Sequence, residues 1–241
     1  MSSKINKATI QHRRATASDW TSNNPTPKQG EWCLETDTDY TKMGDGTTAW
    51  NDLRYNVGPS WADLRVPALA GKIGVGSPPA FTKVLDDGAG SAGVFAYLFD
   101  DTADEQLFFV VQMPHDWKIG SDIESHVHWM PVANGGAGEN VSWGLEYSMQ
   151  ERGSTFANTT IIYGDVSTPD ETLIADRHYV TEIGDIDMSG VTTISAMFIC
   201  RIFRDATSTG GIDDYGDDAA LLEIDFHYIR DTLGSRTEYI K

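Results

Sequence analysis

Long hydrophobic runs and cysteines are scarce in this 241-residue chain. Apolar runs such as 94–99 and 107–111 fall far short of the roughly 20 residues that a membrane-spanning helix needs. The first residues include no apolar stretch, so we expect no secretory signal. The two cysteines, Cys33 and Cys200, are too few for a disulfide framework. We expect both to be buried free thiols, in a protein that is assembled in a reducing cytoplasm.

Basic residues are also few, and the imbalance is unevenly spread. The chain has 18 Lys and Arg against 36 Asp and Glu, a net charge of −18. Residues 1–65 contain eight of each sign, so the whole excess of negative charge follows residue 65. No acidic residue precedes Asp19. This division suggests two parts with different partners, and the acidic part is a poor match for nucleic acid, which needs clustered Lys and Arg.

Composition divides the chain into three segments. Residues 1–65 are rich in Thr, Asn, Asp and Trp, and we expect a small β-rich N-terminal stem or docking module there. Residues 66–92 are dense in Gly, Ala and Pro, which is typical of a linker. Residues 93–241 form a series of strand-like runs separated by Gly, Asp, Ser and Pro clusters.

Apolar and polar residues alternate along the third segment, notably in 123–129, 141–149 and 222–228. Such alternation indicates antiparallel strands that are buried on one face. A helical apolar stripe of 12 residues or more does not occur in the sequence, although short helices fit 15–22, with Ser18 as cap, or 79–86. The predicted fold class is all-β, with residues 93–241 as an antiparallel β-sandwich of jelly-roll type.

Two histidines on one strand are the best candidates for metal ligands. His126 and His128 are two residues apart, so both side chains point to one face of a strand, which Glu124 shares. With Gly120 before them they resemble the first half of the cupin metal motif, but the second half is missing.

A second polar strand face carries Glu223, Asp225 and His227. If this strand were a neighbour of the first, a mixed nitrogen and oxygen site would be possible. The alternative, which we favour at this point, is a polar sheet face without a metal; no cofactor is predicted.

Other possible sites are weaker. The Gly-x-Gly-x-x-Gly match at 88–93 precedes a strand-like run and not a helix, which favours a hinge over a nucleotide site. Acidic clusters near residues 37–45, 100–105 and 213–218 follow no calcium-loop pattern and are expected to be solvated turns. No nucleophile elbow or catalytic histidine spacing occurs in the sequence, so no catalytic residue is predicted.

Ordered blocks of residues 10–55 resemble a module of bacteriophage fibre and appendage proteins. The blocks are an Arg-Arg-x-Thr start at Arg13, a Trp-x-x-x-Asn-Pro turn from Trp20, a Gly-Glu segment from Gly30 to Asp37, and Gly-Asp-Gly-Thr-x-x-Trp-x-Asp-Leu from Gly44. The final run 225–239 and the segment 126–131 also look like phage virion proteins, which favours a structural role for their histidines.

The resemblance implies how such a module is used. We expect a small core made of aromatic and apolar residues, namely Trp20, Trp32, Trp50 and Leu53. Small units bury a poor share of their surface and gain from packing against copies of themselves. In the resembled family these modules sit in trimeric stems, which implies a homotrimer. The predicted docking residues are the basic ones near the start: Lys4, Lys7, Arg13 and Arg14.

The leading hypothesis is a non-enzymatic virion protein, either a short trimeric fibre or a head-surface decoration. Its partners would be other virion proteins and, through loops such as 134–140 or 207–218, a host-surface glycan or protein, with no nucleic acid and no membrane. The first alternative is a tail fibre with dedicated receptor recognition, and the second is a metal- or carboxylate-dependent glycan-degrading enzyme. A third is a cellular carbohydrate-binding protein that stacks Trp117, Trp129 and Trp143 on sugars. The expected localisation is the virion.

Overall fold

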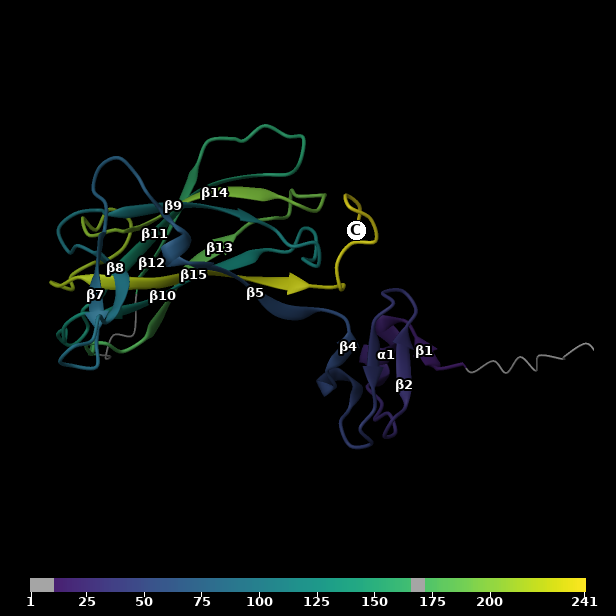
Figure 1. Ribbon diagram of the computed structural model, residues 1–241. Helices are drawn as coiled ribbons and strands as arrows, with labels where there is room; N and C mark the ends of the chain where they lie inside the picture. Colours follow the sequence, from purple (N-terminus) through teal and green to yellow (C-terminus); the bar gives the residue numbers. More distant parts are fainter. Residues whose placement is uncertain (1–10, 166–171) are drawn as a thin grey trace, which may run out of the picture. The chain divides into compact units, whose positions relative to one another are not determined.

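The computed structural model describes residues 11–165 and 172–241 (Figure 1). The chain divides into two compact units. The first runs to Ser60 and includes Arg230–Thr232, and the second comprises Trp61–Ile229 and Leu233–Lys241. Among the described residues, the helices are all too short or too polar to cross a membrane.

The first unit is a four-stranded sheet with one short helix. Its sheet has the order β1-β2-β3-β4, in which β1 and β2 are parallel and the other pairs antiparallel. Its elements are β1 (Arg13–Ala15), α1 (Ala17–Asn23), β2 (Trp32–Glu35), β3 (Thr41–Met43), the 3₁₀ turn η1 (Trp50–Asp52) and β4 (Tyr55–Val57).

The N-cap of helix α1 lies two residues before the one that we expected. The side chain of Thr16, not of Ser18, accepts a hydrogen bond from the backbone N–H of Asp19 at 3.1 Å. Thr16 has an extended backbone, which an N-cap needs, whereas Ser18 already lies within the helix. The helix ends at Asn24, whose left-handed conformation closes the last turn.

The core of the first unit is smaller than predicted. Trp20 and Trp50 are buried and stack with ring centroids 4.2 Å apart, and Cys33 completes the cluster. Trp32 and Leu53 are only partly buried and lie outside it. The alternation of β2 explains Trp32, because Cys33 and Glu35 occupy its inner face and Trp32 therefore points the other way.

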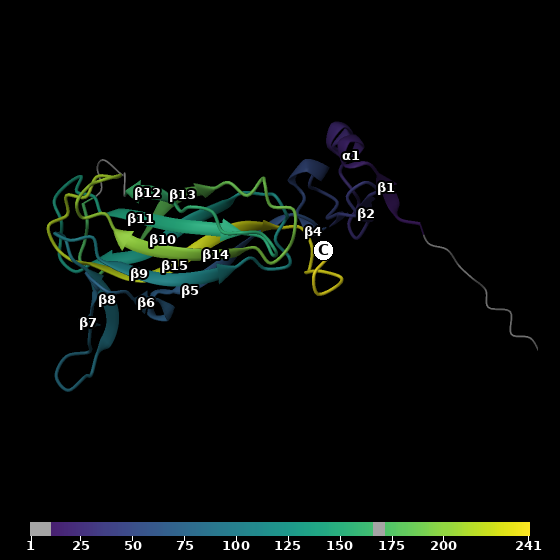
Figure 2. The ribbon, with the colours of Figure 1, turned by 90° about the horizontal axis from the view of Figure 1, so that it is seen from above.

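The second unit is an all-β sandwich, as predicted. Its two sheets have the strand orders β13-β10-β15-β8-β7 and β12-β11-β14-β9-β6 (Figure 2). Strand β5 also belongs to the first sheet, where it pairs with β15. Its elements are β5 (Ser60–Pro67), the 3₁₀ turn η2 (Ala68–Ala70), β6 (Lys72–Ile73), β7 (Ala80–Leu85), β8 (Val94–Phe99), β9 (Gln106–Gln112), β10 (Ile123–Pro131), β11 (Ser142–Gln150), β12 (Thr160–Asp165), β13 (Tyr179–Ile186), β14 (Met197–Arg204) and β15 (Ala219–Arg230).

The order of the eight strands β8 to β15 is that of a jelly roll. Counted from one to eight, they occupy the orders 1-8-3-6 and 2-7-4-5. Among these eight strands, β11 and β12 are the one pair that is both consecutive in the sequence and adjacent in a sheet, and the two sheets enclose one apolar core. Trp117, Trp129 and Trp143 are all fully buried in that core. They are therefore unavailable for stacking on a sugar, which removes the basis of the third hypothesis.

The segment 66–92 is not a plain linker. It contains β6, which pairs with β9, and β7, which pairs with β8 along most of its length. The run 79–86, a possible helix by sequence, is thus largely strand β7. Pairing with a neighbouring strand outweighs the weak local preference of this Gly- and Pro-rich stretch.

A fully buried arginine fixes the loop that follows β14. All five guanidinium N–H groups of Arg204 donate hydrogen bonds. Two go to the carboxylate of Asp213, at 2.9 and 2.7 Å, and three go to the backbone carbonyls of Phe99, Tyr215 and Asp217. The loop 205–218 is thereby held against the end of β8.

Candidate functional site

Strands β10 and β15 are neighbours, which is the condition for a mixed nitrogen and oxygen site. In their antiparallel register Glu124 faces His227, and His126 faces Asp225. Directly opposite residues of this kind have Cβ atoms about 5 Å apart, so their side chains can meet. The two polar faces recognised in the sequence therefore form one surface on the outside of the sheet, which we call the histidine–carboxylate face.

Alternation along both strands creates this face. Ile123, Ser125 and Val127 of β10 point into the sandwich, and so do Ile224 and Phe226 of β15. The residues between them must then point outward.

A bulge interrupts the alternation near the start of β15. His128 pairs with Glu223 and Trp129 pairs with Leu221, so that Leu222 is an extra residue. Leu221 is consequently buried and Leu222 is exposed, whereas simple alternation predicts Leu222 on the inner face.

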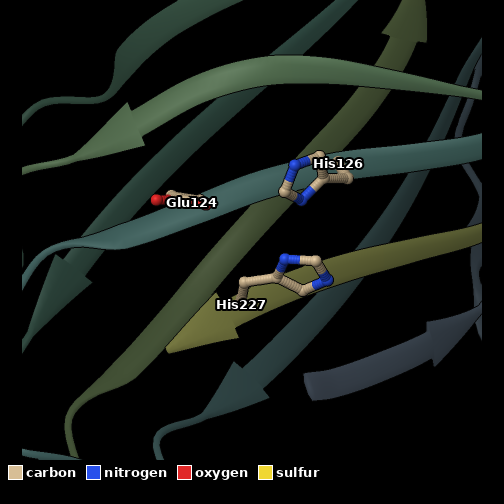
Figure 3. Close-up of side chains that lie close together, drawn as sticks. All are labelled: Glu124, His126 and His227. Carbon is tan, nitrogen blue, oxygen red and sulfur yellow. The ribbon is translucent and has the colours of Figure 1, made fainter. Parts of the chain in front are cut away.

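Three side chains of the face approach one another closely. The rings of His126 and His227 have centroids 4.3 Å apart with an angle of 47° between their planes. One possible ligand atom each from Glu124, His126 and His227 lie within 4.8 Å of one another (Figure 3). Among the described residues, the buried Nδ1 of His126 has no hydrogen-bond partner.

Asp225 lies beneath the histidines and is only 4 % exposed. Its Oδ2 is 3.2 Å from Nε2 of His227 and 3.7 Å from Nε2 of His128. Its Oδ1 is buried and has no hydrogen-bond partner within the described part of the chain. Asp63 of β5 also lies 3.3 Å from Nε2 of His227.

His128 is not a member of the close group, although the sequence made it a candidate. Its Nδ1 lies 2.8 Å from Nε2 of His178, and the two rings stack at 5.0 Å. Both line a polar hollow of about 500 Å³ beside the group, together with Asp63, Arg65, Leu222, Glu223 and Asp225. The third member of the close group is therefore His227 of β15 and not His128. This exchange depends on the pairing of β10 with β15, which the sequence alone does not show.

Burial lowers the pKa of His126, and the neighbouring His227 acts in the same direction. The carboxylates of Glu182, Asp225 and Glu124 oppose this shift. The shift favours the neutral ring of His126, which keeps a lone pair that can bind a cation.

The acidic clusters of the sequence have structural roles. Asp45 accepts hydrogen bonds from the hydroxyl of Thr48 and from the backbone N–H groups of Thr48 and Thr47, which fix a turn and keep the pKa of Asp45 well below its usual range. Asp100 accepts one from the N–H of Thr102 in the same manner. Asp100, Asp101 and Asp218 also lie close together, in loops at one end of the sandwich.

The predicted docking residues of the first unit are in part exposed. Arg13 and Arg14 are both exposed, and Arg13 also lies 5.0 Å from the ring of Trp20 and 3.6 Å from the carboxylate of Glu31. Lys4 and Lys7 lie outside the described residues.

A buried lysine joins the strands of this unit. Nζ of Lys42 donates a hydrogen bond to the carbonyl oxygen of Trp50 at 2.7 Å, and it lies 4.3 Å from the centre of the Tyr55 ring. Burial lowers the pKa of Lys42, and Glu35 opposes this shift. Glu35 is itself buried and accepts a hydrogen bond from the hydroxyl of Tyr55 at 2.7 Å.

The Gly-Asp-Gly block of the sequence is a tight turn. A side chain at Gly44 would place its Cβ atom 2.2 Å from the carbonyl oxygen of Lys28, which is a steric clash. Glycine avoids this clash because it has no Cβ. Gly46 has a φ of +81°, in the region that glycine adopts without strain. The turn therefore depends on glycine at both positions.

Residues 10–48 match the family model of the major tropism determinant N-terminal domain. This tropism-determinant-like segment contains β1, α1, β2, β3 and the Gly-Asp-Gly turn, and it covers less than a fifth of the chain. It supports the resemblance to bacteriophage appendage proteins. Trp50 and Leu53 follow the matched range.

No curated protein matches the chain. Solved structures give distant similarities. One is the N-terminal endo-1,4-β-D-xylanase 10B of Clostridium thermocellum, with its CBM22-1 and GH10 modules and xylohexaose, at 12 % identity and a TM-score of 0.34 over 70 % of this chain and 26 % of that one. Another is infectious bursal disease virus, Gx strain, at 12 % identity and a TM-score of 0.27 over 80 % and 42 %. The chain thus spans about a quarter to less than half of these structures.

Proposed function

We propose that this protein is a non-enzymatic structural protein of a bacteriophage virion, in which the N-terminal unit docks to the particle and the acidic sandwich faces outward. The observation that carries the proposal is the tropism-determinant-like segment at 10–48. The charge distribution agrees with it, because the neutral part coincides with the proposed docking part and the excess of 18 negative charges follows residue 65. A high charge of one sign keeps an exposed surface from aggregating.

Loops at one end of the sandwich are candidates for contact with a host glycan or protein. The loops 134–140 and 207–218 hold each other: the N–H of Asn140 donates to the carboxylate of Asp214 at 2.6 Å, and the N–H of Tyr215 donates to the carbonyl of Asn140 at 3.1 Å. Arg204 anchors the second loop from below. Such loops on a rigid scaffold present a fixed surface, which reduces the entropy cost of binding.

A homotrimer is part of the proposal. The outer face of the sheet that contains β9 and β14 has exposed apolar side chains, including Val110 at 63 % and the directly paired Ile199 at 53 %. Phe108 is exposed on the same face and lines an apolar hollow of about 390 Å³. Apolar side chains gathered on one sheet face favour contact with another subunit.

The oligomeric state can be measured by size-exclusion chromatography with light scattering. We expect about 80 kDa, three times the 26.5 kDa of the chain. Val110→Asp together with Ile199→Asp would reduce this mass to that of a monomer if the apolar face is the interface, whereas Val180→Asp, at an exposed position of the other sheet, would not. A monomeric wild type would refute the trimer and leave the virion proposal standing.

Mass spectrometry of purified particles of a phage whose genome encodes the protein tests the virion proposal directly. We expect peptides from both units in particles that are free of host protein. Densitometry of the same particles distinguishes the two placements, because a head decoration is present in many copies and a tail fibre in few. Absence of the protein from infectious particles would refute the proposal.

A further inference from the structure

We propose that the histidine–carboxylate face binds one zinc ion through Glu124, His126 and His227. Two imidazole nitrogens and one carboxylate oxygen form a ligand set that suits zinc, and they come from two strands whose register is fixed by the sheet. This site is separate from the proposed docking role, which belongs to the first unit.

The positions of the ligand atoms fit one ion. At zinc–ligand distances of about 2.0–2.2 Å, two ligand atoms are at most about 4.4 Å apart. The three candidate atoms already lie within 4.8 Å of one another, so small rotations of the side chains bring them to one centre. Figure 3 shows the two rings facing each other across β10 and β15, with Glu124 on the same face.

Carboxylates hold His227 in the orientation that a ligand needs. Its Nε2 lies 3.2 Å from a carboxylate oxygen of Asp225 and 3.3 Å from one of Asp63, and these negative charges favour the tautomer that carries its proton on Nε2. Nδ1 then remains as the ligand atom. Histidines that bind zinc commonly donate their other N–H to a carboxylate in this way, which fixes the tautomer and makes the ligating nitrogen more basic.

Two polar atoms of the face have no partner among the described residues. They are Nδ1 of His126 and Oδ1 of Asp225, and Asp225 is more than nine-tenths buried. Buried polar atoms without partners are rare because their desolvation is not compensated. An ion on His126 satisfies the first atom directly, and its charge stabilises the buried Asp225 carboxylate, which lies against the ligand His227.

The local charge also favours a cation. Asp63, Glu124, Glu182 and Asp225 surround the two histidines, whereas the nearby Arg65 is paired with Glu223 by two hydrogen bonds. Calcium and magnesium prefer an all-oxygen shell, so the two nitrogen donors select zinc over both. Three protein ligands leave a fourth position for water, and the ion links β10 to β15 at the centre of the sheet.

Competition against a colorimetric zinc chelator tests the site in the full-length protein. After treatment with EDTA, we expect the wild type to bind one equivalent of zinc, with no competition from an excess of calcium or magnesium. His126→Ala and His227→Ala should each weaken binding at least about tenfold, and Asp225→Asn by about 10–100-fold through the orientation of His227. His12→Ala is the matched control, since His12 lies in the first unit, and it should leave binding unchanged.

A spectroscopic readout and a mild variant keep the test independent of folding. Cobalt in place of zinc should give the visible absorption of a four-coordinate ion, and this absorption should be lost in His227→Ala. Glu124→Gln changes one partly exposed atom and should keep the metal-free melting temperature while weakening zinc binding. The proposal is overturned if the wild type binds no zinc, or if His126→Ala and His227→Ala, melting normally in EDTA, bind it as tightly as His12→Ala does.

Discussion

Replacing Arg204 with methionine should destabilise the sandwich more than any surface substitution. The change removes five hydrogen bonds and leaves the Asp213 carboxylate, whose side chain is 2 % exposed, without its counter-charge. Breaking a buried ion pair by removing one partner typically costs about 3–5 kcal/mol. For a domain of this size that corresponds to a decrease in melting temperature of roughly 6–20 °C.

Urea unfolding followed by near-ultraviolet circular dichroism measures this cost, because tryptophans fill the core of the sandwich. Arg201→Met is the matched control on the same strand. Arg201 pairs with Glu146 at 2.8 Å, but both side chains are 24 % exposed, and such pairs contribute about 0–1 kcal/mol. Equal losses in the two variants, or a loss below about 1 kcal/mol in Arg204→Met, would refute the reasoning.

The same variant has a pH dependence whose sign is fixed. Burial raises the pKa of Asp213, and Arg204 acts against this shift. Without Arg204 the folded-state pKa rises further above its unfolded value, so stability is lost as the pH rises through that folded-state pKa. The difference in free energy of unfolding between wild type and Arg204→Met should therefore be smaller at pH 5 than at pH 8. A difference that grows as the pH falls would contradict this account.

Other predictions concern the thiols and the glycine turn. Cys33 and Cys200 are buried, and burial raises the pKa of Cys200 to about 12. The native protein should therefore not react with a thiol reagent at pH 8, whereas two thiols per chain should react in denaturant. Rapid reaction of the native protein would contradict their burial. Gly44→Ala should destabilise the first unit by about 1–3 kcal/mol, since its Cβ would overlap the Lys28 carbonyl, whereas Gly216→Ala, with open space around it, should be neutral in the same thermal melt. Equal melting of these two variants would show that the turn relaxes.

Much of the fold follows from local patterns in the sequence. Alternation identified the strands that contain Ile123, Trp143 and Phe226, and the number of such runs indicated a sandwich. The polar face was also readable, because Glu124 and His126 alternate with core residues. Whether it meets His227 depended on the pairing of β10 with β15, which are about a hundred residues apart, and no local pattern reports that.

The misses have physical causes of the same kind. Strand β7 is formed by pairing with β8, not by its own residues, and the bulge at Leu222 reverses which leucine is buried. Trp32 was assigned to the core because of its size, but the inner face of β2 belongs to Cys33. The role of Arg204 had no distinctive sequence signal, because Arg201 lies in the same run, and its five acceptor atoms come from two separate parts of the chain, Phe99 and the loop 205–218.

The position of β15 has a consequence for the order of folding. This strand lies between β10 and β8 and also pairs with β5. Among the described residues it is the last strand of the sandwich to be synthesised. Until β15 is inserted, β10 and β8 present unpaired edges, and the two sheets cannot close over their core. A chain interrupted before residue 219 therefore retains exposed edges that invite aggregation, and a fold with pairings so distant in sequence forms slowly. Closure of the sandwich thus depends on the segment that contains β15.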